Sequence, residues 1–220
     1  SSSRFRAALQ LLSLGVPGLR AAARSHWRGL CRGRFRRARG AAPPPLLVTL
    51  ELTTRCNLSC RMCWQRKTGG RALPPAAVTA LLDEWGPARP LWQLTGGEPL
   101  LHPELDPILA AFARRKSPLL FNTNGLQLEE WAGRLAHHPG LLRIAVSLDG
   151  EPAVHDALRG IPGAFDRTVA GIRKLGEARK KTGRRLPLLQ LNCAVTADNY
   201  RQLPFLAGLA TRFTLIRIRG

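Results

Sequence analysis

The chain has 220 residues and a formal net charge of +20, from 34 Lys and Arg against 14 Asp and Glu. This length suits one domain with a sizeable core plus a tail, and 45% hydrophobic with 22% charged residues excludes a fully disordered or collagen-like chain. No run of about 18 uninterrupted apolar residues occurs, so the sequence predicts no membrane-spanning helix.

The basic charge is concentrated at the N-terminus, where residues 1–45 contain ten Arg and no Asp or Glu. We expect residues 1–45 to form an Arg-rich N-terminal extension and residues 46–220 to form the core domain, cut short at its C-terminus. The extension fits a basic arm packed on the domain, a targeting segment or a membrane-surface segment. The net charge also attracts anionic partners such as nucleic acid, lipid or phosphorylated substrates.

From residue 46 onward, short β-rich apolar runs alternate with longer helical patterns. The predicted strands cover residues 46–53, 91–95, 119–123, 142–148, 188–195 and 213–218. The predicted helices between them cover residues 75–85, 104–115, 127–137, 164–182 and 199–211. This alternation predicts an α/β fold with right-handed βαβ units and a parallel sheet, and six such strands can close into a partial (β/α)6 barrel.

Polar, Gly-rich and Cys-rich segments directly follow the predicted strands. Cys56 lies just after the first strand, Gly96-Gly97-Glu98-Pro99 after the second, Asn124-Gly125 after the third and Asp149-Gly150 after the fourth. The carboxyl ends of parallel strands share one edge of a sheet and form the binding face of such folds. We therefore expect these segments to meet at one site.

Three of the five cysteines, Cys56, Cys60 and Cys63, fall within eight residues. This spacing suits a metal and not a disulfide framework, which indicates a reducing compartment such as the cytoplasm. Three thiolates on one loop can hold three corners of an iron–sulfur cube and leave the fourth iron open. A structural zinc, with His102 or Cys31 as fourth ligand, is the alternative that the spacing alone leaves open.

The segment Gly96-Gly97-Glu98-Pro99 supplies an independent signal. Two glycines allow a ligand to lie against the backbone, and a carboxylate accepts hydrogen bonds from an ammonium group. By itself the tetrapeptide would indicate only a loop, but beside the cysteine loop it points to a ligand site.

Together these motifs resemble the radical S-adenosylmethionine (radical SAM) family. Cys56-x3-Cys60-x2-Cys63 matches its cluster motif, Gly96 to Pro99 is similar to its methionine-binding motif, and Ser147-Leu148-Asp149-Gly150 is similar to its fourth-strand segment. Residues 154–166 also resemble the branch that contains the molybdenum-cofactor cyclase and the SPASM-type enzymes that modify peptides and proteins. The resemblance covers residues 46–220 and implies a partial barrel of the radical SAM type.

The resemblance implies a [4Fe–4S] cluster and S-adenosylmethionine as cofactors, with reductive cleavage of the latter to a 5′-deoxyadenosyl radical that abstracts a substrate hydrogen. It further implies specific ligands. Cys56, Cys60 and Cys63 would bind the cluster, and the cofactor would contact Met62, Gly96, Gly97, Glu98, Ser147 and Asn192. The implied partners are a peptide or small-molecule substrate and an electron donor of the flavodoxin or ferredoxin type.

One feature departs from the pattern of the SPASM-type branch. Cys193 is the only cysteine after Cys63, so these 220 residues cannot build an auxiliary cluster, and we expect Cys193 to be a buried bystander.

The rival interpretation is a zinc-stabilised, basic α/β nucleic-acid-binding protein without radical chemistry. The five Trp and one Tyr are not interleaved with the Arg clusters as a base-stacking surface would require, so nucleic acid is the less favoured partner.

Overall fold

The computed structural model describes residues 45–63 and 70–213. Its strands are β1 (Leu47–Glu51), β2 (Leu91–Thr95), β3 (Leu119–Thr123), β4 (Leu141–Ser147) and β5 (Leu188–Asn192). Its helices are α3 (Pro75–Trp85), α4 (Leu105–Arg114), α5 (Leu128–His137), α6 (Pro152–Arg159), α7 (Ala164–Lys181) and α8 (Leu203–Arg212). Short 3-10 helices cover Gly86–Ala88, Pro99–Leu101 and Tyr200–Gln202.

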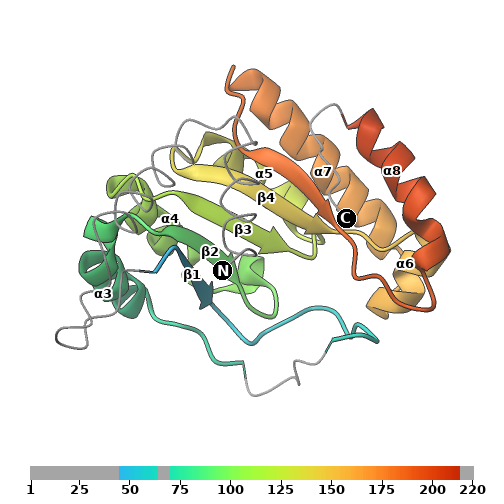
Figure 1. Ribbon diagram of the computed structural model, residues 1–220, viewed down its shortest axis with the longest axis horizontal. Coiled ribbons are helices and arrows are strands. Elements are labelled where there is room, and N and C mark those ends of the chain that lie inside the picture. Colours follow the sequence, from blue (N-terminus) through green and yellow to red (C-terminus); the bar gives the residue numbers. More distant parts are fainter. Residues whose placement is uncertain (1–44, 64–69, 214–220) are drawn as a thin grey trace, which may run out of the picture.

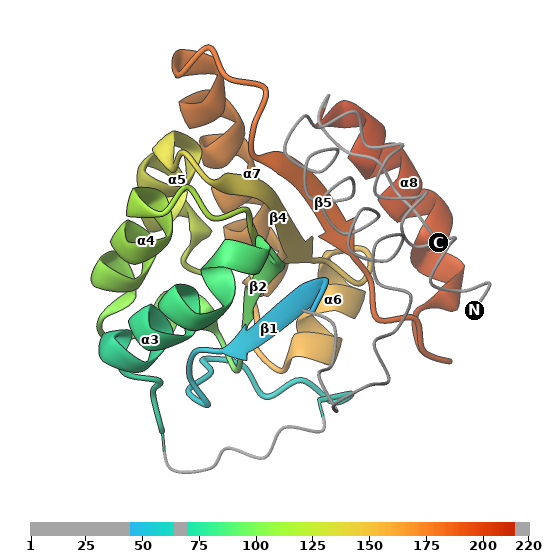
Figure 2. The ribbon, with the colours of Figure 1, turned by 60° about the vertical axis from the view of Figure 1, so that its left-hand side comes forward.

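All neighbouring strands pair in parallel, in the order β1-β2-β3-β4-β5. The order follows the chain because each strand is joined to the next by a crossover that contains at least one helix, as Figures 1 and 2 show. The predicted α/β fold with a parallel sheet is confirmed for the described residues. The sixth predicted strand, 213–218, and the Arg-rich extension lie outside them, apart from the boundary residues Phe213 and Pro45.

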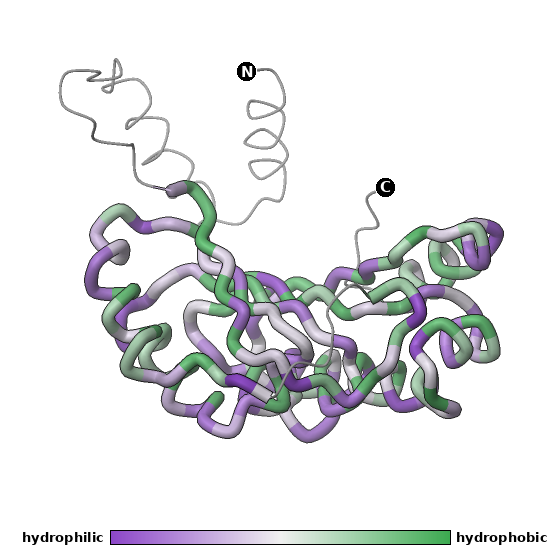
Figure 3. The backbone as a smooth tube through the Cα atoms, turned by 90° about the horizontal axis from the view of Figure 1, so that it is seen from below, coloured by the Kyte–Doolittle hydropathy of each residue, from purple (hydrophilic) through white to green (hydrophobic). Residues whose placement is uncertain are grey.

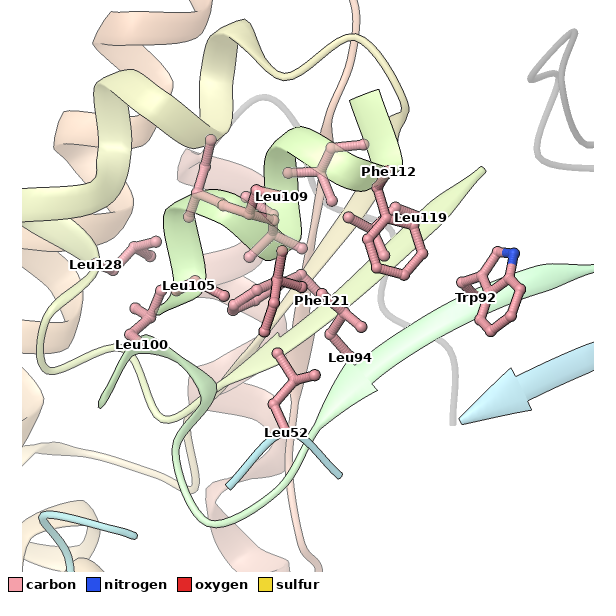
Figure 4. Close-up of a cluster of buried hydrophobic side chains, with 14 of the residues drawn as sticks. Leu52, Trp92, Leu94, Leu100, Leu105, Leu109, Phe112, Leu119, Phe121 and Leu128 are labelled. Carbon is pink, nitrogen blue, oxygen red and sulfur yellow. The ribbon is translucent and has the colours of Figure 1, made fainter. Parts of the chain in front are cut away.

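The main core lies between the sheet and the helices of one face, chiefly α3, α4, α5 and α7. Its largest fully buried side chains include Trp92 on β2, Phe112 on α4 and Phe121 on β3, and the rings of Trp92 and Phe112 meet edge to face at 5.7 Å. Figure 4 shows how these side chains interdigitate with leucines of the same cluster. Burial of this apolar area fixes the sheet register, since a slip by one residue would expose it.

We name the opposite side of the sheet the inner face. It carries Thr95, Asn122, Ser147 and Asn192, because alternate residues of each strand point away from the core. Figure 3 shows that the described chain is curved in this view and that hydrophilic and hydrophobic residues are mixed along it. None of the described helices is both long and apolar enough to cross a membrane.

The predicted helices agree with the structure to within a few residues, except that the last begins as the 3-10 turn Tyr200–Gln202 before α8. Helix α6 was not predicted. It is only eight residues long and buries just His155 and Leu158, so it has too few turns for a repeating apolar pattern to be recognised. Its visible signals are Pro152 at the start and Gly160 at the end, where φ is 80°.

Candidate functional site

A cavity of about 640 Å³ opens at the carboxyl ends of the strands. The predicted residues that line it are Cys56, Cys60, Cys63, Met62, Gly96, Gly97, Ser147 and Asn192. The structure therefore brings together eight of the nine predicted site residues from the cysteine loop and from the ends of β2, β4 and β5. Glu98 is the exception and lies behind the cavity wall.

The cysteine loop is held in place by the end of α6. The backbone N–H of Ser59 donates to the carbonyl of Arg159 at 3.3 Å, and that of Arg61 donates to the carbonyl of Leu158 at 2.9 Å. A Cβ atom at Gly160 would lie 2.9 Å from the Ser59 carbonyl oxygen. The unpredicted helix thus positions the predicted cysteines, and a glycine ends it because the loop passes so close.

The Gly-Gly segment is bound to the strand end from which the cysteine loop starts. The N–H of Gly97 donates to the Thr53 carbonyl at 2.7 Å, and the N–H of Glu98 donates to the Arg55 carbonyl at 2.7 Å. At Gly97 an added Cβ would lie 2.2 Å from the Arg55 carbonyl oxygen, so no side chain fits there. The two motifs form one backbone-bonded unit along the cavity.

Glu98 is completely buried and accepts hydrogen bonds from three groups of its own chain. Its Oε1 accepts from the N–H of Leu100 at 3.0 Å and from the Thr123 hydroxyl at 2.8 Å, and its Oε2 accepts from the N–H of Asn124 at 2.6 Å. Burial raises the pKa of Glu98 from its ordinary value of 4.5 to about 7, although these three bonds and the charge of Arg159 act in the opposite direction. The carboxyl group therefore joins the ends of β2 and β3.

A raised carboxyl pKa makes the folded chain less stable as the pH rises from about 4.5 to about 7, because the unfolded chain has released this proton and the folded chain has not. The substitution Glu98→Gln removes the titrating group. We expect it to lower the free energy of unfolding more at about pH 5 than at about pH 8, and the two decreases should differ by on the order of 3 kcal/mol. Urea unfolding of both proteins without cofactors measures this difference. An equal cost at both pH values would contradict it and would mean that Glu98 is ionised throughout.

Asn124 contacts the cysteine loop from the end of β3. Its amide nitrogen donates to Oδ1 of Asn57 at 2.8 Å and lies 3.9 Å from the Cys56 sulfur. Its Oδ1 accepts from the N–H of Leu126 at 3.0 Å, which fixes the orientation of the amide. The turn after the third strand therefore supports the first cysteine, and Asn124 lines the cavity as expected from its place after that strand.

The main feature of the site that sequence reasoning missed is Arg159, which pairs with Asp149. Nε of Arg159 donates to Oδ2 of the fully buried Asp149 at 2.6 Å, and Nη1 lies 3.7 Å from the Cys60 sulfur. Burial lowers the pKa of Arg159, but the charges of Asp149 and Cys60 outweigh this effect, so the pKa lies above its usual value. The site thus keeps a cation beside one predicted cluster ligand.

Asp149 also fixes the far wall of the cavity. Its Oδ1 accepts from the N–H of Ala194 at 3.0 Å, and its N–H donates to Nδ1 of His155 at 3.1 Å. Burial first, and then the charge of Arg159, lower the pKa of His155 to about 4, so this imidazole is neutral near pH 7 and serves as an acceptor. The sequence carried two signals for this network: Asp149 closely follows the fourth strand, and His155 and Arg159 lie in the segment 154–166 that resembles one branch of the family.

Burial raises the pKa of the Cys56 thiol, and the charges of Glu98 and Cys60 raise it further, although bonds from Leu58 and Asn124 act in the opposite direction. A metal ligand must be a thiolate, so the raised pKa opposes ligation by Cys56 until a cation in the cavity offsets the burial and these neighbouring charges. Cys193, expected as a buried bystander, is only partly buried and lines the cavity, so the expected burial was wrong. Its sulfur lies 3.6 Å from the Asn199 amide nitrogen.

The candidates for a fourth zinc ligand do not complete such a site in the described chain. His102 uses both ring nitrogens on the backbone, with Nε2 3.0 Å from the Leu73 carbonyl and Nδ1 3.0 Å from the N–H of Glu104. Cys31 lies outside the described residues. Within residues 45–63 and 70–213, no three His, Cys, Asp or Glu side chains are grouped closely enough to share one metal ion. Three thiols around a larger cavity fit a cluster better than one ion.

Comparison with known proteins agrees with this geometry. An AdoMet-dependent heme synthase of Methanosarcina barkeri is 36% identical over 141 residues, which cover 61% of this chain and 40% of that protein. An Fe-coproporphyrin III synthase of the same organism is 30% identical over 177 residues, which cover 78% of this chain and 42% of that protein. The chain thus spans less than half the length of these relatives.

Among solved structures, Streptococcus suis SuiB bound to the precursor peptide SuiA matches with a TM-score of 0.70 at 17% identity, over 90% of this chain and 43% of that one. This likeness concerns the fold, which agrees with the predicted barrel type. The model of the Radical SAM superfamily matches residues 50–190, which include the cysteine loop, the Gly-Gly segment and the end of β4. The chain therefore belongs to the radical SAM superfamily.

Proposed function

We propose that this chain forms the core of an enzyme that cleaves S-adenosylmethionine reductively and abstracts a hydrogen atom from its substrate. Its superfamily uses a [4Fe–4S] cluster and S-adenosylmethionine as cofactors, which together supply a 5′-deoxyadenosyl radical when bound. The observation that carries the proposal is the meeting of Cys56, Cys60 and Cys63 with the Gly96-Gly97 backbone in one cavity. The zinc-stabilised nucleic-acid-binding alternative has no comparable support.

Each wall of the cavity has a proposed role. Cys56, Cys60 and Cys63 would hold the cluster, and the backbone of Gly96 and Gly97 would lie against the methionine part of the cofactor. The backbone of Met62 would contact the adenine, while Ser147 and Asn192 at the ends of β4 and β5 would offer polar groups to the ribose or carboxylate. These assignments place the cofactor across the strand ends, where ligands of parallel α/β folds bind.

Glu98 and Arg159 would act in different ways. Because the Glu98 carboxyl accepts bonds from Leu100, Thr123 and Asn124, its proposed role is to hold the Gly-Gly loop in shape for the methionine amine. Arg159, 3.7 Å from the Cys60 sulfur, would offset the negative charge of the thiolates and the cluster. Its ion pair with Asp149 keeps the guanidinium in that position.

The proposed substrate is a peptide or protein side chain, or a small biosynthetic intermediate. SuiB is seen with a precursor peptide, while the relatives from Methanosarcina barkeri are named for heme and Fe-coproporphyrin III synthesis. The proposed electron donor is of the flavodoxin or ferredoxin type. A reducing compartment such as the cytoplasm fits a site built on thiolates. The Arg-rich residues 1–45 are proposed as a basic arm packed on the domain, with contact to an anionic membrane surface as the alternative.

The test is 5′-deoxyadenosine release after anaerobic reconstitution of the chain with iron and sulfide. With dithionite as reductant and S-adenosylmethionine present, we expect iron and sulfide to co-purify with the protein and 5′-deoxyadenosine to accumulate above a sample without reductant. Binding of zinc instead of an iron–sulfur cluster, with no reductant-dependent product, would overturn the proposal.

A further inference from the structure

A cationic side chain lies on the inner face of the sheet, below the cofactor cavity. Ile144 and Val146 of β4 pack in the main core, so Arg143, between Leu142 and Ile144, points to the inner face like Ser147. Its Nη1 donates to Oε1 of Gln190 at 2.9 Å, whereas its Nε is buried and has no hydrogen-bond partner in the described part of the chain. A buried donor left unpaired is costly, so this group is a candidate for binding a ligand.

No Asp or Glu side chain in the described part of the chain forms an ion pair with Arg143. All 14 Asp and Glu residues of the sequence lie in the described ranges 45–63 and 70–213, and none of them forms an ion pair with Arg143 there. The guanidinium is half-buried, and burial lowers its pKa with no opposing charge nearby. Charges in such places are ordinarily paired, because desolvation of a single ion is unfavourable.

The surroundings of Arg143 are apolar. In the sheet register it lies between Leu120 of β3 and Leu188 of β5. Leu120 belongs to a small cluster, here named the leucine floor, whose members are Leu91, Leu120, Leu142, Leu186 and Leu188. The inner face thus combines a cation that has no ion-pair partner in the described chain with a buried apolar cluster at the same depth of the sheet.

A chain of hydrogen bonds joins Arg143 to the cavity. Gln190, which accepts from Arg143, donates through Nε2 to Oδ1 of Asn192 at 2.5 Å, and Asn192 lines the cavity. Arg143 precedes Ser147 by four residues, about 13 Å along a strand. A molecule that reaches Arg143 from the strand ends would therefore lie below the cofactor and extend toward it.

We propose that Arg143 binds a carboxylate of the substrate while the apolar frame that carries this carboxylate packs on the leucine floor. The inference rests on the proposed function, whose substrate class it narrows. A carboxylate matches the single guanidinium in charge and can accept two parallel N–H bonds, including one from the unpaired Nε. A phosphate dianion would leave one charge uncompensated beside the leucines.

The test is a titration of the chain, without cluster or S-adenosylmethionine, followed by nitrogen-15 NMR of arginine Nε–H groups. The Arg143 resonance is assigned by its loss in Arg143→Gln. Octanoate and octanamide, which differ in charge, probe a small-molecule carboxylate. The capped peptides Leu-Leu-Glu-Leu-Leu and Leu-Leu-Gln-Leu-Leu probe a peptide carboxylate, so the arm that binds identifies the source.

We expect at least one acid to shift the Arg143 resonance and to bind about tenfold more tightly than its amide. Arg143→Gln should remove this preference, Arg143→Lys should keep part of it, and Arg173→Gln should keep all of it. The last variant removes one charge from an exposed position of α7 and is the control for net charge. Without ligand, Arg143→Gln should not lower the unfolding midpoint, since the native charge is unpaired.

Equal binding of acid and amide in both arms would overturn the inference. A lower midpoint of Arg143→Gln with unchanged ligand binding would also overturn it, because it would mark a structural arginine. A separate titration of the iron- and sulfide-reconstituted protein with S-adenosylmethionine supplies the third check: weaker binding by Arg143→Gln than by Arg173→Gln would assign Arg143 to the cofactor and overturn the inference. Because no radical chemistry enters the titration, its failure is distinguishable from a failure to release 5′-deoxyadenosine.

Discussion

Replacing Cys60 by alanine should abolish reductant-dependent 5′-deoxyadenosine formation. The rate of formation should fall at least about a thousandfold, to the background of the unreconstituted chain. Two thiolates cannot hold a cube that needs three, and the Cys60 sulfur also lies 3.7 Å from the Arg159 guanidinium. The measurement is product formation by chromatography, together with iron and sulfide content per chain.

Cys193→Ala is the matched control for this variant. Cys193 lines the same cavity but lies outside the three-cysteine loop, so its loss should leave iron content and product formation largely intact. Equal losses in both variants would mean that the cluster is not held by the loop alone. Full activity of Cys60→Ala would contradict the site assignment outright.

Gly97→Ala should destabilise the folded chain by about 3 kcal/mol or more and prevent cluster assembly. Its Cβ would lie 2.2 Å from the Arg55 carbonyl oxygen, which is backbone and cannot move aside as a side chain could. Relief of this clash would break the bonds from the N–H groups of Gly97 and Glu98 to Thr53 and Arg55, which position the cysteine loop. Urea unfolding and iron content after reconstitution measure the two effects.

Gly133→Ala provides the matched control, because an added Cβ at this position in α5 meets no atom within 4 Å. Alanine is favoured over glycine in a helix by about 0.5–1 kcal/mol, so this variant should be neutral or slightly more stable. If Gly97→Ala and Gly133→Ala unfold at the same urea concentration, the close approach at Gly97 does not exist in solution.

The fold was predictable where periodic burial dominates. The five described strands and most helices have clear apolar patterns, and the alternation of the two element types implied a parallel sheet. Helix α6 was missed because its eight residues bury only two side chains. The tertiary contact that gives it importance, its backbone bonds to Ser59 and Arg61, has no local signature.

The sequence by itself determined the local chemistry: three thiols on one loop, a Gly-Gly turn and polar strand ends that parallel topology must bring to one edge. Only the tertiary structure decided which groups meet across long separations, such as Arg159 with Cys60, 99 residues apart, and Asn124 with Asn57, 67 residues apart. It also decided that Glu98 lies behind the cavity wall and that Arg143 has no carboxylate partner in the described chain. Partners of this kind are chosen by packing and burial in three dimensions, which spacing along the chain does not encode.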